Sequence, residues 1–330
     1  MKLVTFVGSH GRDRVGVVIG KAGQERVFDV ATAAHRDHRP ATAFRTMQAL
    51  IEAGPAALDE ARRLVEAHGA EEDFSRPLDR VKLRAPLPVP TQVRDFSVFP
   101  RHIVGAPAGM RRLLARMQGD EAAAAAIEPD AEVPQVYRDR PIYYITNRFS
   151  VVGPETEVVW PSYSRLMDYE LEIAVVLGKG GTDIPKKAAK GHIFGYTIFN
   201  DFSARDVQLA EMAGMLGPAK GKSFDAGNAM GPFIVTADAV KNPYGLKAKA
   251  LVNGAVWTDS HTGDMLHSFE DMIAYVSRSE TLHPGEVFGS GTVGGGCGLE
   301  LGRFLEPGDT VELSVTGLGT LRNRVVRRDG

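Results

Sequence analysis

The stretch Tyr169-Glu170-Leu171-Glu172-Ile173-Ala174-Val175-Val176-Leu177 has the composition and the alternating pattern of a β-strand. Successive side chains of a strand point to opposite faces, so both glutamates share one face with Ala174 and Val176, and the remaining apolar residues share the other. Apolar residues on both faces predict that both faces are at least partly covered. Two carboxylates about 7 Å apart along the backbone would then be partly buried, which is unfavourable unless a positive charge compensates.

This pair of glutamates has three interpretations on the strand alone. The carboxylates lie on a solvated face, form an acid–base pair of the kind that glycosidases use, or hold a cation. A second acidic segment favours the cation, because residues 192–200 read as another strand that ends in Asn200-Asp201. Asp201, Arg205 and Gln208 are spaced as one face of a following helix. The alternative role for Asp201 is that of a helix N-cap.

The ligand types indicate which cation such a site would prefer. Three carboxylates and water suit a hard cation such as Mg²⁺, Mn²⁺ or Ca²⁺. Zinc is disfavoured, because no Cys/His ligand spacing appears. We therefore expect a divalent metal on Glu170, Glu172 and Asp201.

The chain outside this region divides at a proline-rich segment. At 330 residues it is long for one compact unit, and Ala85–Pro90 carries three prolines in six residues. We expect a small α/β domain over 1–85 and a second domain over 86–330. In the first, strands are predicted over 2–8, 14–20 and 26–30 and helices over 42–52 and 55–68. In the second domain, short strands with Gly-rich connections dominate, and helices are predicted near 104–117, 204–216 and 264–279. The segment 118–133 is either a short helix or a mobile insertion. This pattern favours an α+β, mostly β fold of the sandwich, roll or barrel type over a doubly wound sheet.

Composition excludes several classes of function. The formal net charge of −2 leaves no basic field for nucleic acid or an anionic membrane. A single cysteine, Cys297, excludes a disulfide framework and fits a reducing compartment. No apolar run approaches membrane-spanning length and the start lacks a signal-peptide pattern, so a soluble cytoplasmic protein is expected.

A series of motifs resembles the fumarylacetoacetate hydrolase superfamily, in particular its bacterial fumarylacetoacetase and 2-hydroxyhepta-2,4-diene-1,7-dioate isomerase-like members. The motifs follow the family's order over roughly residues 90–325. They are the Glu-Leu-Glu strand, Asn200-Asp201-Phe202-Ser203-Ala204-Arg205-Asp206-Val207-Gln208, Gly221-Lys222-Ser223-Phe224-Asp225, Leu282-His283-Pro284-Gly285-Glu286, Gly291-Thr292 and Glu306-Pro307-Gly308-Asp309.

The resemblance implies a mixed β-sandwich roll, usually a homodimer, and a set of site residues. Metal ligation falls to Glu170, Glu172 and Asp201. Asp95 lies seven positions before His102, which is the family's spacing between a further ligand and the catalytic histidine. The resemblance also implies a catalytic role for Lys222, and it places Arg111, Tyr144, Arg205, Gln208 and Thr292 at the substrate.

The reaction expected from the resemblance is hydrolysis of a carbon–carbon bond in a small 1,3-diketo acid, such as fumarylacetoacetate or an acylpyruvate. Water activated by His102 attacks, and an enolate stabilised by Mg²⁺ (or Mn²⁺ or Ca²⁺) leaves. Ser97 and Ala226 depart from the hydrolase pattern, and the glutamate expected to orient His102 has no counterpart in 294–297, although Glu300 follows closely. The alternatives are decarboxylation or isomerisation of an oxo-acid (oxaloacetate or 2-hydroxyhepta-2,4-diene-1,7-dioate type) on the same metal, and an oxo-acid-binding protein without catalysis.

Overall fold

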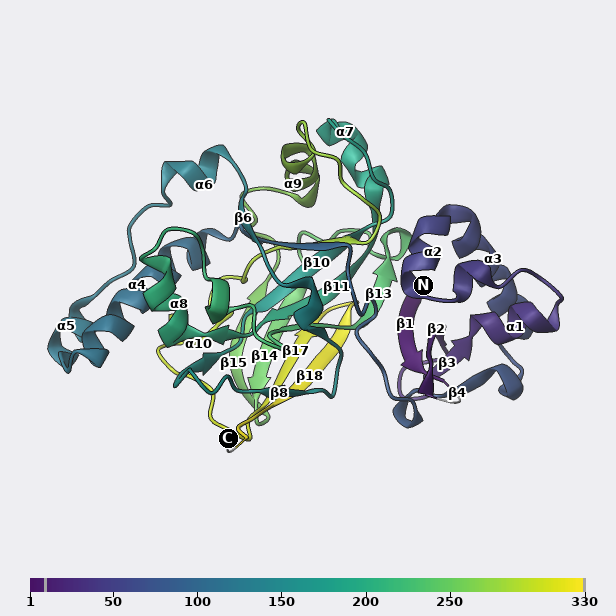
Figure 1. Ribbon diagram of the computed structural model, residues 1–330, viewed down its shortest axis with the longest axis horizontal. Coiled ribbons are helices and arrows are strands. Elements are labelled where there is room, and N and C mark those ends of the chain that lie inside the picture. Colours follow the sequence, from purple (N-terminus) through teal and green to yellow (C-terminus); the bar gives the residue numbers. More distant parts are fainter. Residues whose placement is uncertain (9–10, 329–330) are drawn as a thin grey trace.

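Two large mixed sheets form the centre of the protein, as Figure 1 shows for the computed structural model, which describes residues 1–8 and 11–328. The larger sheet has the order β4-β3-β2-β1-β13-β11-β10-β16-β5-β6, with β7 beside β13. Its strands are β1 (Lys2–Val7), β2 (Asp13–Ile19), β3 (Arg26–Asp29), β4 (Ser75–Pro77), β5 (Gln92–Ser97), β6 (Ile142–Ile145), β7 (Val151–Val152), β10 (Leu171–Leu177), β11 (Ile193–Asp201), β13 (Asn228–Thr236) and β16 (Glu286–Gly289).

The second sheet has the order β15-β14-β17-β18-β8. It consists of β8 (Glu157–Val159), β14 (Lys247–Val252), β15 (Ala255–His261), β17 (Thr310–Val315) and β18 (Gly319–Val326), while β9 (Met167–Asp168) and β12 (Ser203–Ala204) form a separate pair. Most neighbouring strands are antiparallel, and β16 with β5 is one of the parallel pairs. The expected α+β class with mixed sheets is therefore confirmed.

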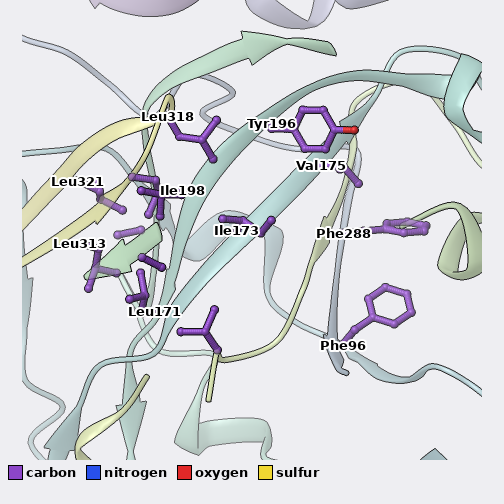
Figure 2. Close-up of a cluster of buried hydrophobic side chains, with 14 of the residues drawn as sticks. Phe96, Leu171, Ile173, Val175, Tyr196, Ile198, Phe288, Leu313, Leu318 and Leu321 are labelled. Carbon is purple, nitrogen blue, oxygen red and sulfur yellow. The ribbon is translucent and has the colours of Figure 1, made fainter. Parts of the chain in front are cut away.

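Strand β10 is buried along its whole length because its two faces enter different hydrophobic cores. Leu171, Ile173 and Val175 belong to the core between the two sheets, where they lie with Leu313 and Leu321 (Figure 2). Ala174 and Val176 on the opposite face belong to a second core, shared with the N-terminal helices. The alternation of the sequence therefore predicted the two covered faces of this strand correctly.

The N-terminal part continues the larger sheet instead of forming a sheet of its own. Strand β1 pairs with β13 in antiparallel register, Lys2 opposite Val235 and Leu3 opposite Ile234. The helices α1 (Val30–Arg36), α2 (Met47–Ala53) and α3 (Pro55–His68) cover this end, at the right of Figure 1. The segment 84–90 has no regular structure, as its prolines predict, but the strands on either side of it share one sheet.

The remaining helices lie mostly at the opposite end and along one edge (Figure 1). They are α4 (Pro100–Met117), α5 (Glu121–Ala126), α6 (Gln135–Asp139), α7 (Lys186–Ala189), α8 (Arg205–Met212), α9 (Phe269–Val276) and α10 (Gly298–Leu301). Helix α5 occupies the alanine-rich tract, and α4 to α6 form the excursion between the paired strands β5 and β6. Among the described residues, no helix combines the length and apolar character needed to cross a membrane.

Candidate metal centre

Neighbouring strands of the larger sheet bring four carboxylates together. Asp95 lies on β5, Glu172 on β10, Glu170 immediately before β10, and Asp201 at the end of β11. The pairings β5·β16, β16·β10 and β10·β11 place these strands side by side. Each residue offers an oxygen that lies within 4.8 Å of the others, and all four side chains are buried. The structure thus gathers the four residues that the sequence nominated as ligands.

Asp201 reaches the cluster by a different route from the one that its spacing predicted. The prediction that Asp201, Arg205 and Gln208 share one face of a helix is wrong. Asp201 is the last residue of β11, and α8 begins only at Arg205. The N-cap of α8 is Ala204, and no side chain caps this end, so the N-cap role is also wrong. A buried strand end, paired opposite Asn228, holds the carboxylate instead.

Gly289 leaves room for two of the carboxylates to meet. A Cβ at this position would lie 2.6 Å from Asp95 Oδ1 and 3.0 Å from Glu172 Oε2. Contacts below 3 Å require something to move, and both neighbours are fixed on adjacent strands. Any larger residue at 289 would therefore push the carboxylates apart.

Two buried cations contact the cluster from one side. Lys222 Nζ donates to Glu170 Oε2 at 2.7 Å and to Asp201 Oδ2 at 2.5 Å. The Arg205 guanidinium lies 2.7 Å from Glu170 Oε1 and 2.8 Å from Asp168 Oδ2. Counting Asp168, five carboxyl groups face two cations, so full ionisation would leave the centre with three negative charges in excess. A divalent cation would reduce this excess to one.

The ionisation of the cluster reflects this imbalance. Burial, together with the charge of Asp201, holds the pKa of Asp95 well above its ordinary value. Burial and then Asp95 and Glu170 raise the pKa of Glu172 in the same way. Glu170 behaves oppositely: burial opposes its ionisation, but Lys222 and Arg205 outweigh burial and lower its pKa. Asp95 and Glu172 are therefore the carboxyls that lack a compensating cation.

Three oxygens of the cluster are available to coordinate a cation. Asp95 Oδ1, Glu172 Oε1 and Asp201 Oδ1 are buried and have no hydrogen-bond partner among the described residues. Buried acceptors of this kind are costly unless something coordinates them. A set made only of carboxylates is the donor set of a hard divalent cation. The residues therefore fit a cation of the Mg²⁺ or Mn²⁺ type.

A histidine–glutamate pair lies beside the carboxylates. His102, in the first turn of α4, has its Nδ1 2.9 Å from Glu300 Oε2, and the Gly295 amide donates to Glu300 Oε1 at 3.0 Å. Burial opposes ionisation of Glu300, but His102 outweighs it and lowers the pKa of this carboxyl. The orienting glutamate expected within 294–297 is thus found in α10. A carboxylate on Nδ1 fixes the tautomer and leaves Nε2 as the basic nitrogen.

Two of the residues expected at the substrate, Tyr144 and Thr292, lie close to these groups. Tyr144 on β6 donates to Asp201 Oδ2 at 2.5 Å and lies 3.1 Å from Asp95 Oδ2. Burial and then Asp201 raise the pKa of Tyr144, so its hydroxyl stays protonated. Thr292 is buried with its hydroxyl unpartnered, next to Gly291, whose amide donates to Glu172. The Thr292 hydroxyl could donate to an oxygen of a ligand, whereas the Tyr144 hydroxyl is already donated to Asp201.

Arg205, Gln208 and Arg111 have structural partners. Arg205 Nη1 donates to Gln208 Oε1 at 2.8 Å, so this pair braces the carboxylates. Arg111 is exposed and donates to Asp130 at 2.9 Å. No hydrogen bond or ion pair joins Arg111 to the cluster in the part of the chain that the structure describes. Its expected contact with substrate stays a prediction.

Sequence reasoning missed two residues that support the site. Asp168 accepts hydrogen bonds from the Gly298 and Leu299 amides, at 2.7 and 2.9 Å, in addition to its ion pair with Arg205. Its position two residues before Glu170 continues the spacing of the two glutamates and was an available signal, although Asp168 lies on β9. Asn200 Oδ1 accepts from the Glu170 amide at 3.0 Å. Neither residue could be separated from a capping or surface role without the fold.

Residues 110–326 match the family described as fumarylacetoacetate (FAA) hydrolase C-terminal. The chain belongs to the fumarylacetoacetate hydrolase family. Within this family, the oxaloacetate tautomerase YisK of Bacillus subtilis (strain 168) is 30% identical over 96% of this chain and 97% of its own length.

Solved structures of the fumarylacetoacetate hydrolase family have the same fold. The fumarylacetoacetate hydrolase of the psychrophile Exiguobacterium antarcticum has a TM-score of 0.72 and 27% identity, covering 99% of this chain and all 100% of that one. The maleylpyruvate hydrolase of Sphingobium sp. SYK-6, in complex with manganese (II) ion and pyruvate, has a TM-score of 0.70 over 100% of both chains, at 23% identity. Relatives of this family thus include tautomerases as well as hydrolases.

Proposed function

We propose that the protein is a divalent-metal-dependent enzyme that interconverts the keto and enol forms of a small oxo-diacid of the oxaloacetate type. The observation that carries this proposal is the oriented His102–Glu300 pair beside four convergent carboxylates. Similarity to an oxaloacetate tautomerase over nearly the whole of both chains favours this reaction among those of the family. The proposal takes the isomerase alternative of the sequence analysis and makes its chemistry specific.

The cation proposed for this site is Mg²⁺ or Mn²⁺, held by Asp95, Glu170, Glu172 and Asp201. When bound, it would supply Lewis-acid stabilisation of negative charge on the oxygens of an oxo-acid. This assignment rests on the all-oxygen donor set and on the three unpartnered oxygens. The manganese complex of the Sphingobium relative is consistent with it.

The residues of the chain supply the proton transfers. His102 Nε2 accepts the proton from the carbon next to the keto group, while Glu300 stabilises the imidazolium that forms. Lys222 is a buried donor that would stabilise the oxygen on which negative charge develops, and the half-buried Tyr144 would do so by turning its hydroxyl away from Asp201. The proton held on His102 is then delivered to this oxygen, directly or through water, so the product is the enol, the imidazole is neutral again and the enzyme is unchanged.

Hydrolysis of a 1,3-diketo acid is the second candidate. The segment 294–297 lacks the glutamate that the resemblance implies for orienting the catalytic histidine, which argues against water activation. The contact between His102 and Glu300 removes that objection. The same base could accept a proton from water instead of from carbon.

One set of assays separates these reactions. The chelator-treated protein is supplied with Mg²⁺ and enol-form oxaloacetate, and the enol absorbance is followed against a metal-only control. Faster approach to an unchanged endpoint supports tautomerisation. Pyruvate and carbon dioxide indicate decarboxylation, and two acids formed from an acylpyruvate indicate hydrolysis. His102→Asn should abolish the activity, whereas His261→Asn, at an exposed histidine, should not. Absence of turnover on all substrates would refute the proposal and leave an oxo-acid-binding protein.

The expected homodimer remains a proposal. Met215 and Leu216, in the connection between α8 and Lys222, are 89% and 99% exposed. Apolar side chains exposed to this extent are a feature of interaction surfaces. Light scattering of the purified protein would give twice the chain mass of 35.6 kDa if the proposal is right.

A further inference from the structure

Cys297 is the only cysteine of the chain, and its side chain lies against the His102–Glu300 pair. The thiol is fully buried at the start of α10 and contacts Glu300 Oε2 at 3.3 Å. The same oxygen lies 2.9 Å from His102 Nδ1. The proposed reaction uses the imidazole and the carboxylate but has no role for the sulfur. A sulfur, a nitrogen and an oxygen donor therefore surround one point.

The spacing of these three donors suits a small metal ion. The ligand atoms of His102, Cys297 and Glu300 all lie within 4.8 Å of one another. In a tetrahedral zinc site, bonds of about 2.0–2.3 Å keep ligand atoms about 3.3–3.8 Å apart. Small movements of the three side chains would reach this geometry. A fourth position would be left for water, as in zinc sites with three protein ligands.

Donor softness separates this cluster from the carboxylate centre. The four carboxylates prefer hard cations, whereas thiolate and imidazole select zinc and other thiophilic metals. The two clusters adjoin, because Cys297 and Glu170 form a β-bridge through their backbones. Their side chains nevertheless belong to separate groups of potential ligands.

We propose that His102, Cys297 and Glu300 form a second metal site, which binds a thiophilic divalent cation such as Zn²⁺ or Cd²⁺. Binding forms a metal–sulfur bond and releases the thiol proton to solvent, with no change in oxidation state. The imidazole and the carboxylate each donate a lone pair. A divalent cation, a thiolate, a carboxylate and a neutral imidazole sum to zero charge, which suits a buried site.

Occupation of this site removes the general base. His102 and Glu300 cannot hold a metal and move a proton at the same time, so a thiophilic metal inhibits turnover even when Mg²⁺ saturates the carboxylates. This inhibitory consequence rests on the proposed function. The binding of the metal does not, so the two can fail separately.

Cadmium titration tests the site directly, because the Cd²⁺–thiolate bond has an ultraviolet charge-transfer band and the chain has one cysteine. With Mg²⁺ in excess, we expect the wild-type band to saturate at one Cd²⁺ per chain. Cys297→Ser should lose the band. His102→Ala and Glu300→Gln should keep the thiol but weaken binding by about 100-fold, since even groups that only support a metal ligand contribute about 10- to 100-fold. His261→Ala is the matched control and should bind as wild type.

Three results would overturn the proposal: no band in the wild-type protein, the same affinity in His102→Ala as in wild type, or a stoichiometry other than one. The wild-type and His102→Ala measurements decide the question even if Cys297→Ser does not fold. In the turnover assay, Cd²⁺ should inhibit wild type with the affinity of the band. If the protein shows no turnover on any substrate, the band still decides whether the metal site exists.

Discussion

Replacing Glu172 by glutamine should change stability and metal binding in opposite directions. Glu172 is fully buried, its Oε2 accepts the Gly291 amide at 3.0 Å, and its Oε1 has no partner. Glutamine has the same shape and can still accept from Gly291. Its amide nitrogen can donate to Asp95 Oδ1, which is also unpartnered. At a pH at which Glu172 is ionised, the substitution therefore removes one charge from a crowded cluster and supplies a donor.

The expected magnitudes follow from these contacts. A new hydrogen bond to a charged group contributes about 1.5–3 kcal/mol. The free energy of unfolding should therefore be larger for the metal-free variant than for the metal-free wild type. Mg²⁺ at 100 times its dissociation constant stabilises a protein by about 2.7 kcal/mol. If the lost ligand weakens binding about 100-fold, the same Mg²⁺ concentration stabilises the variant by only about 0.4 kcal/mol.

The effect of Mg²⁺ on the wild type should also grow with pH. The pKa values of Asp95 and Glu172 are raised in the folded, metal-free protein by burial and neighbouring carboxylates. As pH rises above the ordinary carboxyl range, the unfolded chain loses these protons first, so the metal-free protein becomes less stable. Mg²⁺ must displace the same protons, so it binds more tightly at higher pH. The Mg²⁺-induced stabilisation should thus be larger at pH 8 than at pH 6.

Urea unfolding with and without Mg²⁺ measures all of these quantities. Glu286→Gln is the matched control, because Glu286 is another buried glutamate on the same sheet, paired with Arg94 at 3.1 Å and not part of the cluster. It should lose stability but keep the full Mg²⁺ effect. The reasoning is refuted if Glu172→Gln keeps the Mg²⁺ effect, or if it destabilises the metal-free protein as Glu286→Gln does.

Three further substitutions test other contacts of the site. Glu300→Gln removes the charge that stabilises His102 as imidazolium. We expect kcat/KM to fall about 100-fold, at the lower end of what general acid–base catalysis contributes, while Mg²⁺ binding is retained. An unchanged kcat/KM would exclude a catalytic role for the His102–Glu300 pair. Lys222→Met leaves Glu170 and Asp201 without their shared cation, so the metal-free protein should lose about 3–5 kcal/mol in urea unfolding and Mg²⁺ should restore part of it. Arg111→Ala removes only an exposed ion pair, so the free energy of unfolding should change by less than about 1 kcal/mol and KM should not change. A large rise in KM would instead indicate that Arg111 contacts the substrate.

The strand pattern predicted the central part of the site because alternation depends only on local geometry. Glu170 and Glu172 lie on the face that the sequence assigned to them, and β10 is covered on both sides. Asp95 was nominated through its spacing from His102 in a known family, and the sheet order brings it to the glutamates. The spacing within a strand says nothing about which other strands lie beside it, so the fourth ligand required this resemblance.

The errors came from contacts between segments that are distant in the sequence. Asp201 was placed on a helix because its spacing to Arg205 is four residues, but strand pairing extends β11 through Asp201. Glu300 was not assigned to His102, which is 198 residues away. Its position three residues after the Gly-rich segment does not indicate where its side chain points. The pairing of β1 with β13 could not be predicted from the sequence either, because a proline-rich segment indicates a boundary whether or not the strands on its two sides pair. The domain boundary itself stays a prediction.

Binding of Mn²⁺ tests the central claim most directly. Free Mn²⁺ gives a strong electron paramagnetic resonance signal that is lost on binding to a protein, so titration of the chelator-treated chain gives affinity and stoichiometry without any assumption about substrate. We predict one Mn²⁺ per chain in the wild type, displaced by Mg²⁺, and loss of this binding in Asp201→Asn. Unchanged binding in Asp201→Asn, or no binding in the wild type, would contradict the assignment of the carboxylate cluster as a metal centre.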